Sequence, residues 1–231
     1  MIDVRPFNGI GRADHGWLQT GHHFSFSSYF NRDRMAWGKL RVWNDDTIAP
    51  QNGFPPHPHD NMEIITFVRT GAITHKDSLG NTGRTAAGDV QVMSAGTGIV
   101  HAEYNLEDEP TTLFQIWIQP DRTGEKPSWG QREFPRGERS NRWEVVASGN
   151  PDDAALPIRS DARVLAATLE AGRSVTYDTG ADRHLYLVAP GGRVRVNGVE
   201  ADPRDGIAIT GEESVTVEAI DATEVVMVDA S

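Results

Sequence analysis

The stretch Phe54-Pro-Pro-His-Pro-His-Asp-Asn-Met-Glu63 places two histidines two positions apart among three prolines. Because a residue before proline is disfavoured in the helical region, His57 is expected to have an extended backbone. Side chains two positions apart on an extended strand lie on the same face, so His57 and His59 should point in the same direction. The stretch therefore predicts a stiff β-strand that presents a pair of imidazoles on one side.

The remainder of the chain predicts a mainly β fold. Short segments alternate apolar and polar residues, are rich in Val, Ile, Thr and aromatic residues, and are separated by Gly, Pro, Asn and Asp. Long helical periodicity is missing, since glycine and proline interrupt most windows of sufficient length. The expected strands lie at residues 38–43, 63–69, 89–93, 113–119, 143–147, 163–169, 184–188, 193–196 and 224–228.

A weak internal repeat divides the chain into two halves. Residues 63–71 can be aligned with residues 184–192, and residues 88–93 with residues 204–209. In each half a strand leads to a glycine turn, and a corner with an acidic residue and a glycine starts another strand. Residues 120–141 contain prolines, glycines and many charges, which is typical of a connection. The repeat predicts two copies of one β-barrel unit, at residues 1–125 and 126–231.

Composition narrows the class of protein. The 231 residues carry a net charge of −11 and include no cysteine, so any metal must be held by nitrogen and oxygen. The absence of disulfides fits a cytoplasmic protein. No apolar run approaches the roughly 20 residues that cross a bilayer, and the first residues lack the features of a secretory signal. Arginines between residues 132 and 142 alternate with glutamates, which predicts a solvated linker and no direct binding of nucleic acid.

A second pair of metal-ligand residues follows a glycine-rich turn in Gly98-Ile-Val-His-Ala-Glu103. His101 and Glu103 are again two positions apart and should share a face of a strand. Two strands that each present an inward pair would bring three imidazoles and one carboxylate together, a set suited to iron, nickel, zinc, manganese or copper. A lone His-x-His also occurs in surface turns, and the second pair is what favours a metal site over that alternative.

The other histidines are expected to lie outside this ligand set. His75 should lie on the outer side of a hairpin, while His15, His22 and His23 should be supporting polar groups near the mouth of the site. Phe54 and Met62 are candidate pocket walls. At the positions that the repeat equates with the four ligands, the second half carries Asp178, Gly180, Val217 and Ala219, which predicts a single metal site.

Both ligand stretches resemble the pirin variant of the cupin motifs. The likeness lies in residues 53–67 and 94–104, and it extends to residues 22–30, 40–44, 113–120 and, weakly, 160–165, so that it covers most of the chain. It implies an all-β bicupin, with two double-stranded β-helix (jelly-roll) barrels packed face to face. It also implies that His57, His59, His101 and Glu103 are the metal ligands in the N-terminal barrel.

The resemblance implies a function as well. Quercetin 2,3-dioxygenase activity is associated with pirins, which would make this chain a metal-dependent oxidoreductase that opens the heterocyclic ring of a flavonol with dioxygen. Fe²⁺ is the first candidate cofactor, with zinc, nickel, manganese or copper as alternatives, and Glu103 would be the catalytic base for the flavonol 3-hydroxyl. Other pirins are non-enzymatic metal-binding proteins that regulate transcription or metabolism through a protein partner. A monomer is expected, because each barrel finds its partner in the same chain.

Overall fold

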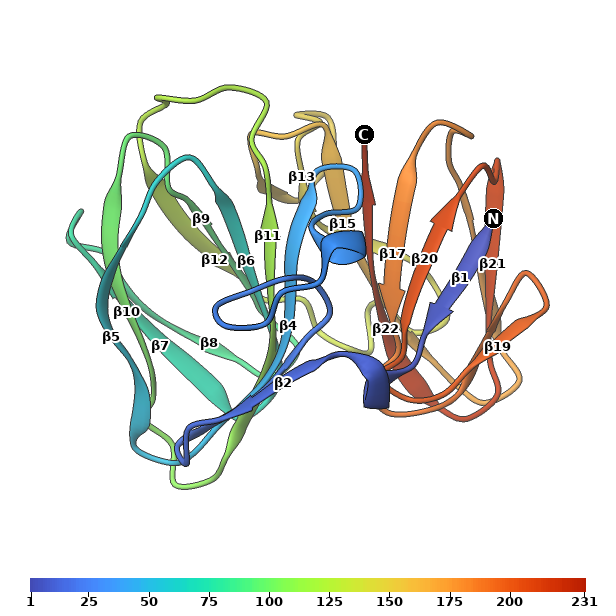
Figure 1. Ribbon diagram of the computed structural model, residues 1–231, viewed down its shortest axis with the longest axis horizontal. Helices are drawn as coiled ribbons and strands as arrows, with labels where there is room; N and C mark the ends of the chain where they lie inside the picture. The colour runs from blue at the N-terminus through green and yellow to red at the C-terminus, as the bar shows by residue number, and fades with distance from the viewer.

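Two β-barrels lie side by side in the computed structural model, which describes residues 1–231 (Figure 1). Twenty-two strands form four sheets, and the helical content is two short 3-10 helices, Phe7–Gly9 (η1) and Arg32–Arg34 (η2). Each barrel combines a seven-stranded and a four-stranded sheet. The mainly β fold and the two-barrel architecture are confirmed. None of the helices has the length and apolar character that a membrane span requires.

The first barrel is built largely from the first half of the chain. Its seven-stranded sheet has the order β12-β9-β6-β11-β4-β3-β2, and its four-stranded sheet has the order β5-β10-β7-β8. The strands are β2 (Gly11–Asp14), β3 (Leu18–His22), β4 (Leu40–Ile48), β5 (Asn52–His59), β6 (Glu63–Thr70), β7 (Ala72–Asp77), β8 (Thr82–Ala86), β9 (Val90–Ser94), β10 (Ile99–Asn105), β11 (Thr111–Ile118) and β12 (Ser128–Arg132).

The second barrel repeats this plan. The order β9-β6-β11-β4 recurs as β20-β17-β22-β15, and β5-β10-β7-β8 recurs as β16-β21-β18-β19, which confirms the internal repeat. The strands are β1 (Ile2–Arg5), β13 (Glu144–Ser148), β14 (Leu156–Pro157), β15 (Ala162–Leu169), β16 (Ser174–Asp178), β17 (His184–Val188), β18 (Val194–Val196), β19 (Val199–Ala201), β20 (Gly206–Thr210), β21 (Ser214–Ala219) and β22 (Thr223–Ala230).

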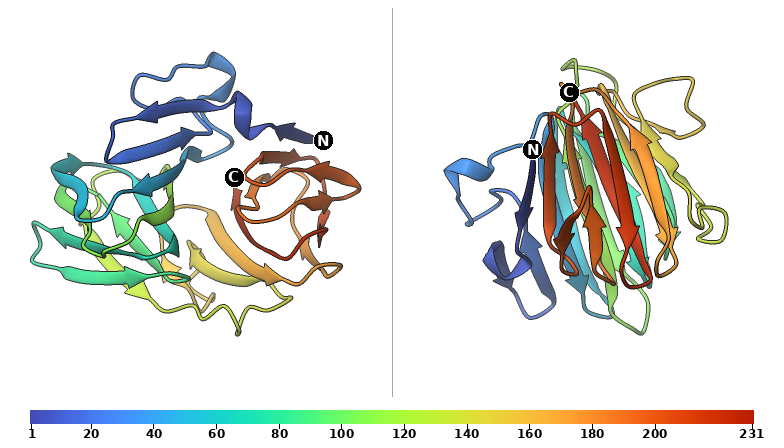
Figure 2. Two further views of the ribbon diagram at one scale, coloured as in Figure 1. Left: turned by 90° about the horizontal axis from the view of Figure 1, so that it is seen from below. Right: turned by 90° about the vertical axis from the view of Figure 1, so that its right-hand side faces the viewer.

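Two strands cross the boundary expected between residues 125 and 126. β1 pairs with β20 of the second barrel, and the N-terminal segment then runs across to the first barrel (Figure 2). β12 lies in the expected linker but pairs with β9 of the first barrel. The linker is also less solvated than expected, since Arg139 is 1% exposed and donates hydrogen bonds to the carbonyls of Gly88 and Phe134 and to the carboxylate of Glu224. A partly buried carboxylate on β22 and two carbonyls, one of them in the linker itself, explain its burial, and a charge pattern could not reveal them.

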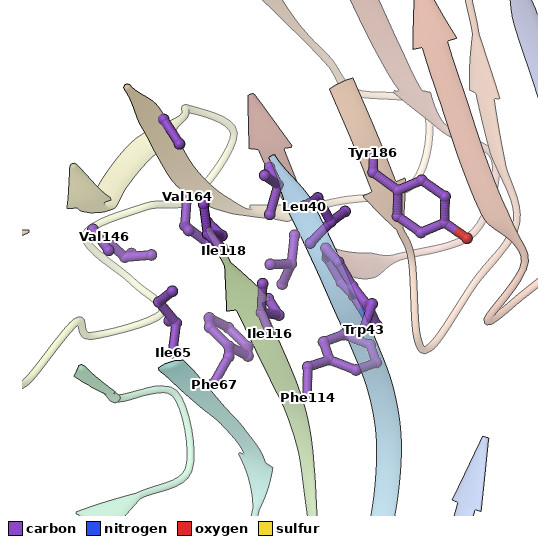
Figure 3. Packing of buried hydrophobic residues seen from close by; sticks show 14 of the residues in the cluster. Leu40, Trp43, Ile65, Phe67, Phe114, Ile116, Ile118, Val146, Val164 and Tyr186 are labelled. Atoms are coloured by element: carbon purple, nitrogen blue, oxygen red, sulfur yellow. The ribbon is translucent and has the colours of Figure 1, made fainter. Parts of the chain in front are cut away.

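An apolar layer joins the two seven-stranded sheets. A cluster of 24 buried residues takes side chains from both barrels, including Ile65 and Phe114 from the first and Val164 and Tyr186 from the second (Figure 3). Strand alternation explains the arrangement, because on β6 and β11 every second residue faces this layer and the residues between face the barrel interior. Each sheet thus covers the other, which supports the expected monomer; the oligomeric state itself remains a prediction.

The interiors of the two barrels differ in polarity. The second barrel is filled by 17 buried apolar residues, among them Val175, Val194, Val196 and Val217. The first barrel has apolar clusters of only five and four residues. Polar side chains such as Thr66, Gln91 and Gln115 occupy its interior positions, and these residues are nearly inaccessible to solvent. Buried polar groups require hydrogen-bond partners, so this interior must contain a polar network.

Candidate metal centre

Strands β5 and β10 position the predicted ligands. They pair antiparallel, with His101 opposite His57 and Ile99 opposite His59. β5 is the edge strand of its sheet, where prolines are tolerated because no neighbouring strand needs their missing N–H groups. On β10, His101 and Glu103 are 2% and 3% exposed whereas Val100 is 42% exposed, so the predicted pair does point into the barrel.

The three histidines converge on one point. Ring nitrogens of His57, His59 and His101 all lie within 4.8 Å of one another. The Nε2 atoms of His57 and His101 are 3.1 Å apart. Two nitrogens that each lie about 2.0–2.1 Å from a shared ion would be about 2.9 Å apart at a right angle and about 3.4 Å apart at a tetrahedral angle. The observed separation falls between these limits.

The protonation of the histidines fits a metal site. Burial, reinforced by the neighbouring imidazoles, lowers the pKa of His59 to about 4 and that of His101 to about 3. Nδ1 of His57 lies 2.8 Å from the carbonyl oxygen of Pro55 and can donate to it, which leaves Nε2 of the neutral ring with a lone pair. Nε2 of His101, 3.1 Å away, can donate to this lone pair, or, in the tautomer with its proton on Nδ1, can direct a second lone pair to the same point, where a metal ion would bind both. The donor set therefore fits a divalent metal ion.

Glu103 lies beside the histidines within a cage of hydrogen-bond donors. One of its carboxylate oxygens is within 4.8 Å of ring nitrogens of His101 and His75, but Glu103 does not belong to the compact group formed with His57 and His59. Its Oε1 accepts from Gln91 Nε2 at 2.6 Å, and its Oε2 accepts from Gln115 Nε2 at 2.9 Å. The structure thus gathers three of the predicted ligands tightly and holds the fourth next to them by other contacts.

His75 is not on the outer side of a hairpin, as expected, but fully buried. It pairs opposite Glu103 in the register of β7 and β10, and its ring stacks on Trp129 with an interplanar angle of 8°. The expectation was wrong because His75 shares a strand face with Ile73 and Asp77. That alternation, with Ile73 as an apolar neighbour two positions away, is the signal that could have revealed its inward orientation.

His75 connects His101 to a buried carboxylate. His75 Nε2 lies 2.9 Å from Asp77 Oδ2, and His75 Nδ1 lies 3.4 Å from His101 Nδ1. If Nε2 of His75 donates to Asp77, its Nδ1 carries a lone pair that faces the Nδ1–H of His101. That tautomer leaves Nε2 of His101 free to bind a metal, which is the usual role of a carboxylate–histidine pair behind a ligand.

An aromatic-rimmed pocket opens beside the histidines. Its volume is about 380 Å³, which is within the range of small-molecule sites. Phe54 lines it as expected, but Met62 does not and instead packs against a neighbouring apolar cluster. The full lining consists of His15, Trp17, Leu18, Thr20, His22, Phe26, Ser27, Asn44, Asp46, Phe54, His57, His59, Glu103, Gln115 and Trp117.

Two of the three N-terminal histidines lie where they were expected. His15 and His22 line the pocket, and His22 Nδ1 lies 3.0 Å from Asn44 Oδ1. His23 does not. It is fully buried, and its Nδ1 lies 2.9 Å from the hydroxyl of Tyr186 on the second barrel. His22 and His23 differ in orientation because the side chains of consecutive residues in an extended chain point to opposite sides.

Comparison with known proteins gives the family. The Pirin family model matches residues 4–118, and the model for the quercetinase C-terminal cupin domain matches residues 145–230. A pirin-like protein of Caulobacter vibrioides is 61% identical over 232 residues, which cover 100% of both chains. The chain belongs to the pirin family. A quercetin 2,3-dioxygenase of Escherichia coli K12 is 38% identical over 99% of this chain and 98% of its own length.

A solved pirin structure has the same fold. The crystal structure of the bacterial pirin YhhW from Escherichia coli in complex with nickel(II) superimposes with a TM-score of 0.93 at 38% identity. The superposition covers 100% of this chain and 99% of that one. The bicupin fold inferred from the ligand stretches is therefore that of a pirin over the whole chain.

The second barrel of this pirin offers no comparable ligand set. Val217 on β21 pairs with Val175 on β16, as His101 on β10 pairs with His57 on β5. The register thus puts Val175, rather than Asp178, at the counterpart of His57. A polar cavity of about 470 Å³ is lined by residues of this barrel, and in it Arg183 forms ion pairs with Asp161 and Asp229.

A variant of His75 tests its role behind His101. His75→Phe keeps an aromatic ring that can stack on Trp129 but removes both nitrogens. We expect the affinity for a divalent metal to fall by roughly 10- to 100-fold, because the orientation and tautomer of His101 lose their support. Competition of the metal-free protein with a chromophoric chelator measures this affinity. The control is His184→Phe on the second barrel, where His184 makes no side-chain hydrogen bond. Equal affinities in the two variants would contradict the role assigned to His75.

Asp46 in the pocket wall carries an unfavourable buried charge. Burial, reinforced by the nearby carboxylates of Asp45 and Glu103, raises the pKa of Asp46 to about 7. Between about pH 4 and pH 7 the folded state binds a proton that the unfolded chain has released. This group therefore makes the folded protein progressively less stable as the pH rises through that interval.

Asp46→Asn removes this charge with little change in shape. For the metal-free protein we expect the variant to be more stable than the native chain at pH 8, by up to about 4 kcal/mol, and similar to it near pH 4. Thermal unfolding across this pH range measures the difference. The exposed Asp108→Asn serves as control and should show no such trend. A stability gain independent of pH would show that Asp46 does not titrate in this interval.

Proposed function

We propose that this pirin is a metal-dependent dioxygenase that opens the heterocyclic ring of a flavonol, as quercetin 2,3-dioxygenases do. The observation that supports this most is the convergence of three imidazoles, with Glu103 beside them, on a pocket with an aromatic rim. His57, His59 and His101 would hold one divalent ion, with Glu103 as the fourth ligand. When bound, this ion would supply Lewis-acid and redox chemistry toward dioxygen.

The pocket walls suit a planar aromatic substrate. Trp17 and Phe54 form an edge-to-face pair with ring centroids 5.1 Å apart, and Phe26 and Trp117 form another at 5.4 Å. These rings offer faces and edges against which a flavonol can pack, and they exclude water from the reacting groups. Hydroxyl groups of the substrate would point to the polar side of the pocket, where Glu103 and Gln115 lie.

Glu103 would take the proton of the substrate hydroxyl. One of its oxygens lies within 4.8 Å of a ring nitrogen of His101, and carboxylates held within hydrogen-bond distance of a substrate hydroxyl are effective general bases. Gln91 and Gln115 fix its two oxygens from different sides, which orients the carboxylate before substrate binds. A base positioned in this way does not depend on strong coordination to the metal.

Turnover tests the proposal directly. The metal-free protein is loaded with Fe²⁺, Ni²⁺, Mn²⁺, Cu²⁺ or Zn²⁺ in turn, and quercetin absorbance is followed together with oxygen uptake. We expect at least one metal form to consume quercetin and oxygen in equal amounts. Tight metal binding without turnover of any flavonol would contradict the proposal and favour a regulatory pirin that acts through a protein partner.

A further inference from the structure

Two consecutive aspartates on β4 face opposite sides of the sheet. Asp45 faces the layer between the barrels, where it pairs with Arg69 and, at 2.7 Å, with Arg204. Asp46 faces the pocket, on the same side of the strand as Asn44. The charge of Asp45 is therefore neutralised within the protein, whereas no arginine or lysine is bonded to Asp46.

Asp46 and its neighbour Thr20 leave hydrogen-bonding capacity unused. Asp46 is 3% exposed and Thr20 is 6% exposed, and they lie opposite each other in the register of β3 and β4. Apart from each other, neither Asp46 Oδ1 nor Thr20 Oγ1 has a hydrogen-bond partner in the protein. A carboxylate oxygen can accept more than one hydrogen bond and a hydroxyl can accept as well as donate, so their mutual contact leaves capacity that a ligand in the pocket can complete.

The position of this pair relative to the proposed base defines a second point of contact. Asn44 pairs with Gln115, which donates to Glu103, and Asp46 is the next residue of β4 on the same face. Two residues along a strand correspond to about 7 Å. A ligand with one oxygen at Glu103 could therefore place a second hydroxyl near Asp46 while its rings lie between the aromatic walls.

We propose that Asp46 and Thr20 form a hydroxyl-binding subsite, which selects polyphenols that carry a hydroxyl on a ring remote from the reacting one. This proposal rests on the function proposed above and names the substrate feature that the pocket recognises, a hydroxyl on the remote ring. Asp46 accepts the hydrogen bond of the remote hydroxyl, and Thr20 can donate to the same oxygen atom. An analogue that lacks this hydroxyl leaves the hydrogen-bonding atoms of Asp46 and Thr20 without a ligand partner. It should therefore bind more weakly than the hydroxylated ligand.

Equilibrium binding of two flavonols tests the subsite. Quercetin is compared with 3-hydroxyflavone, which keeps the 3-hydroxyl but lacks the hydroxyls of both outer rings. Binding is followed without oxygen, through quenching of tryptophan fluorescence, in the metal-free and the metal-loaded protein. At pH 8, above the pKa of about 7 that burial gives Asp46, we expect the native chain to bind quercetin roughly 10- to 100-fold more tightly, as a hydrogen bond to a charged group would predict.

The variants identify which residue carries this preference. Asp46→Leu should bring the ratio of the two dissociation constants close to one, and Asp46→Asn should retain part of the preference because its amide oxygen still accepts. Thr20→Val should lower the ratio by a smaller factor. Thr47→Val, on the opposite face of β4, and the exposed Asp108→Asn are matched controls that should leave it unchanged. Should Asp46→Leu fail to fold, Asp46→Asn and Thr20→Val still test the proposal.

The outcomes separate this proposal from the proposed activity. An unchanged ratio in the Asp46 and Thr20 variants, or no preference for quercetin in the native chain, overturns the subsite even if quercetin is turned over. If the ratio of the two dissociation constants changes in the Asp46 variants as expected, the subsite is supported even if no metal form consumes quercetin. In that case only the dioxygenase proposal fails.

Discussion

Glu103→Gln is expected to retain much of the metal while losing flavonol turnover by about 100-fold or more. Three histidines are sufficient to hold a divalent ion, as catalytic zinc sites show. An amide cannot accept the proton of the substrate hydroxyl, and general-base catalysis commonly contributes 10²- to 10⁴-fold. The position of Glu103 outside the compact histidine group agrees with this separation of roles.

The measurement is activity per bound metal, determined across a pH series beside metal content. Glu109→Gln is a suitable control, since Glu109 is exposed on the loop after β10 and its side chain has no partner. If Glu103 only anchors the metal, metal content and activity will fall together. If activity per bound metal is unchanged, Glu103 is not the base.

The double variant His57→Ala/His101→Ala is expected to abolish tight metal binding. The double variant removes two of the three converging imidazoles. The remaining candidates, His59 and Glu103, lie in different groups and do not form a site by themselves. We expect the native chain to bind one equivalent of divalent metal and the double variant to bind none, with turnover lost in parallel. Circular dichroism should remain that of a β protein, because neither histidine belongs to the apolar layer between the barrels.

Elemental analysis after dialysis gives the metal content. His184→Ala, on β17 of the second barrel where His184 packs against Trp37, is the control and should keep one equivalent. Full metal retention in the double variant would show that the ion binds elsewhere. Two tightly held equivalents in the native chain would show that the second barrel, despite Val175 and Val217, also provides a site.

Much of the fold was predictable from the sequence because alternation of apolar and polar residues is a local property. All nine expected strands coincide with observed strands, and the order of strands confirms the repeat. The exchange of β1 and β12 between barrels was not predictable. The pairing depends on which sheet edge β1 and β12 reach in the folded protein. Each strand has only four or five residues, and its sequence does not indicate which distant strand it pairs with.

The inward orientation of the predicted ligands was also determined by the sequence alone. Proline before and after His57 enforces an extended backbone, and spacing by two residues puts each pair on one face. The missed residues belong to other strands. His75, Gln91, Gln115 and Asp46 carry no motif. His75 comes next to His101 through the pairing of β7 with β10, whereas the other three approach the site only when the four-stranded and seven-stranded sheets close into a barrel.

The sequence by itself determined the β fold, the duplicated barrel and the facing of His57, His59, His101 and Glu103, since each follows from spacing along an extended strand. Only the tertiary structure decided which partners these residues have. It brought His75 and Asp77 behind His101, placed two glutamines on Glu103, and left Asp46 in the pocket wall with Thr20 as its one hydrogen-bonding neighbour. The physical reason is that hydrogen bonds and burial depend on residues from separate strands, whose distances are set by strand pairing and sheet closure and not by position in the chain.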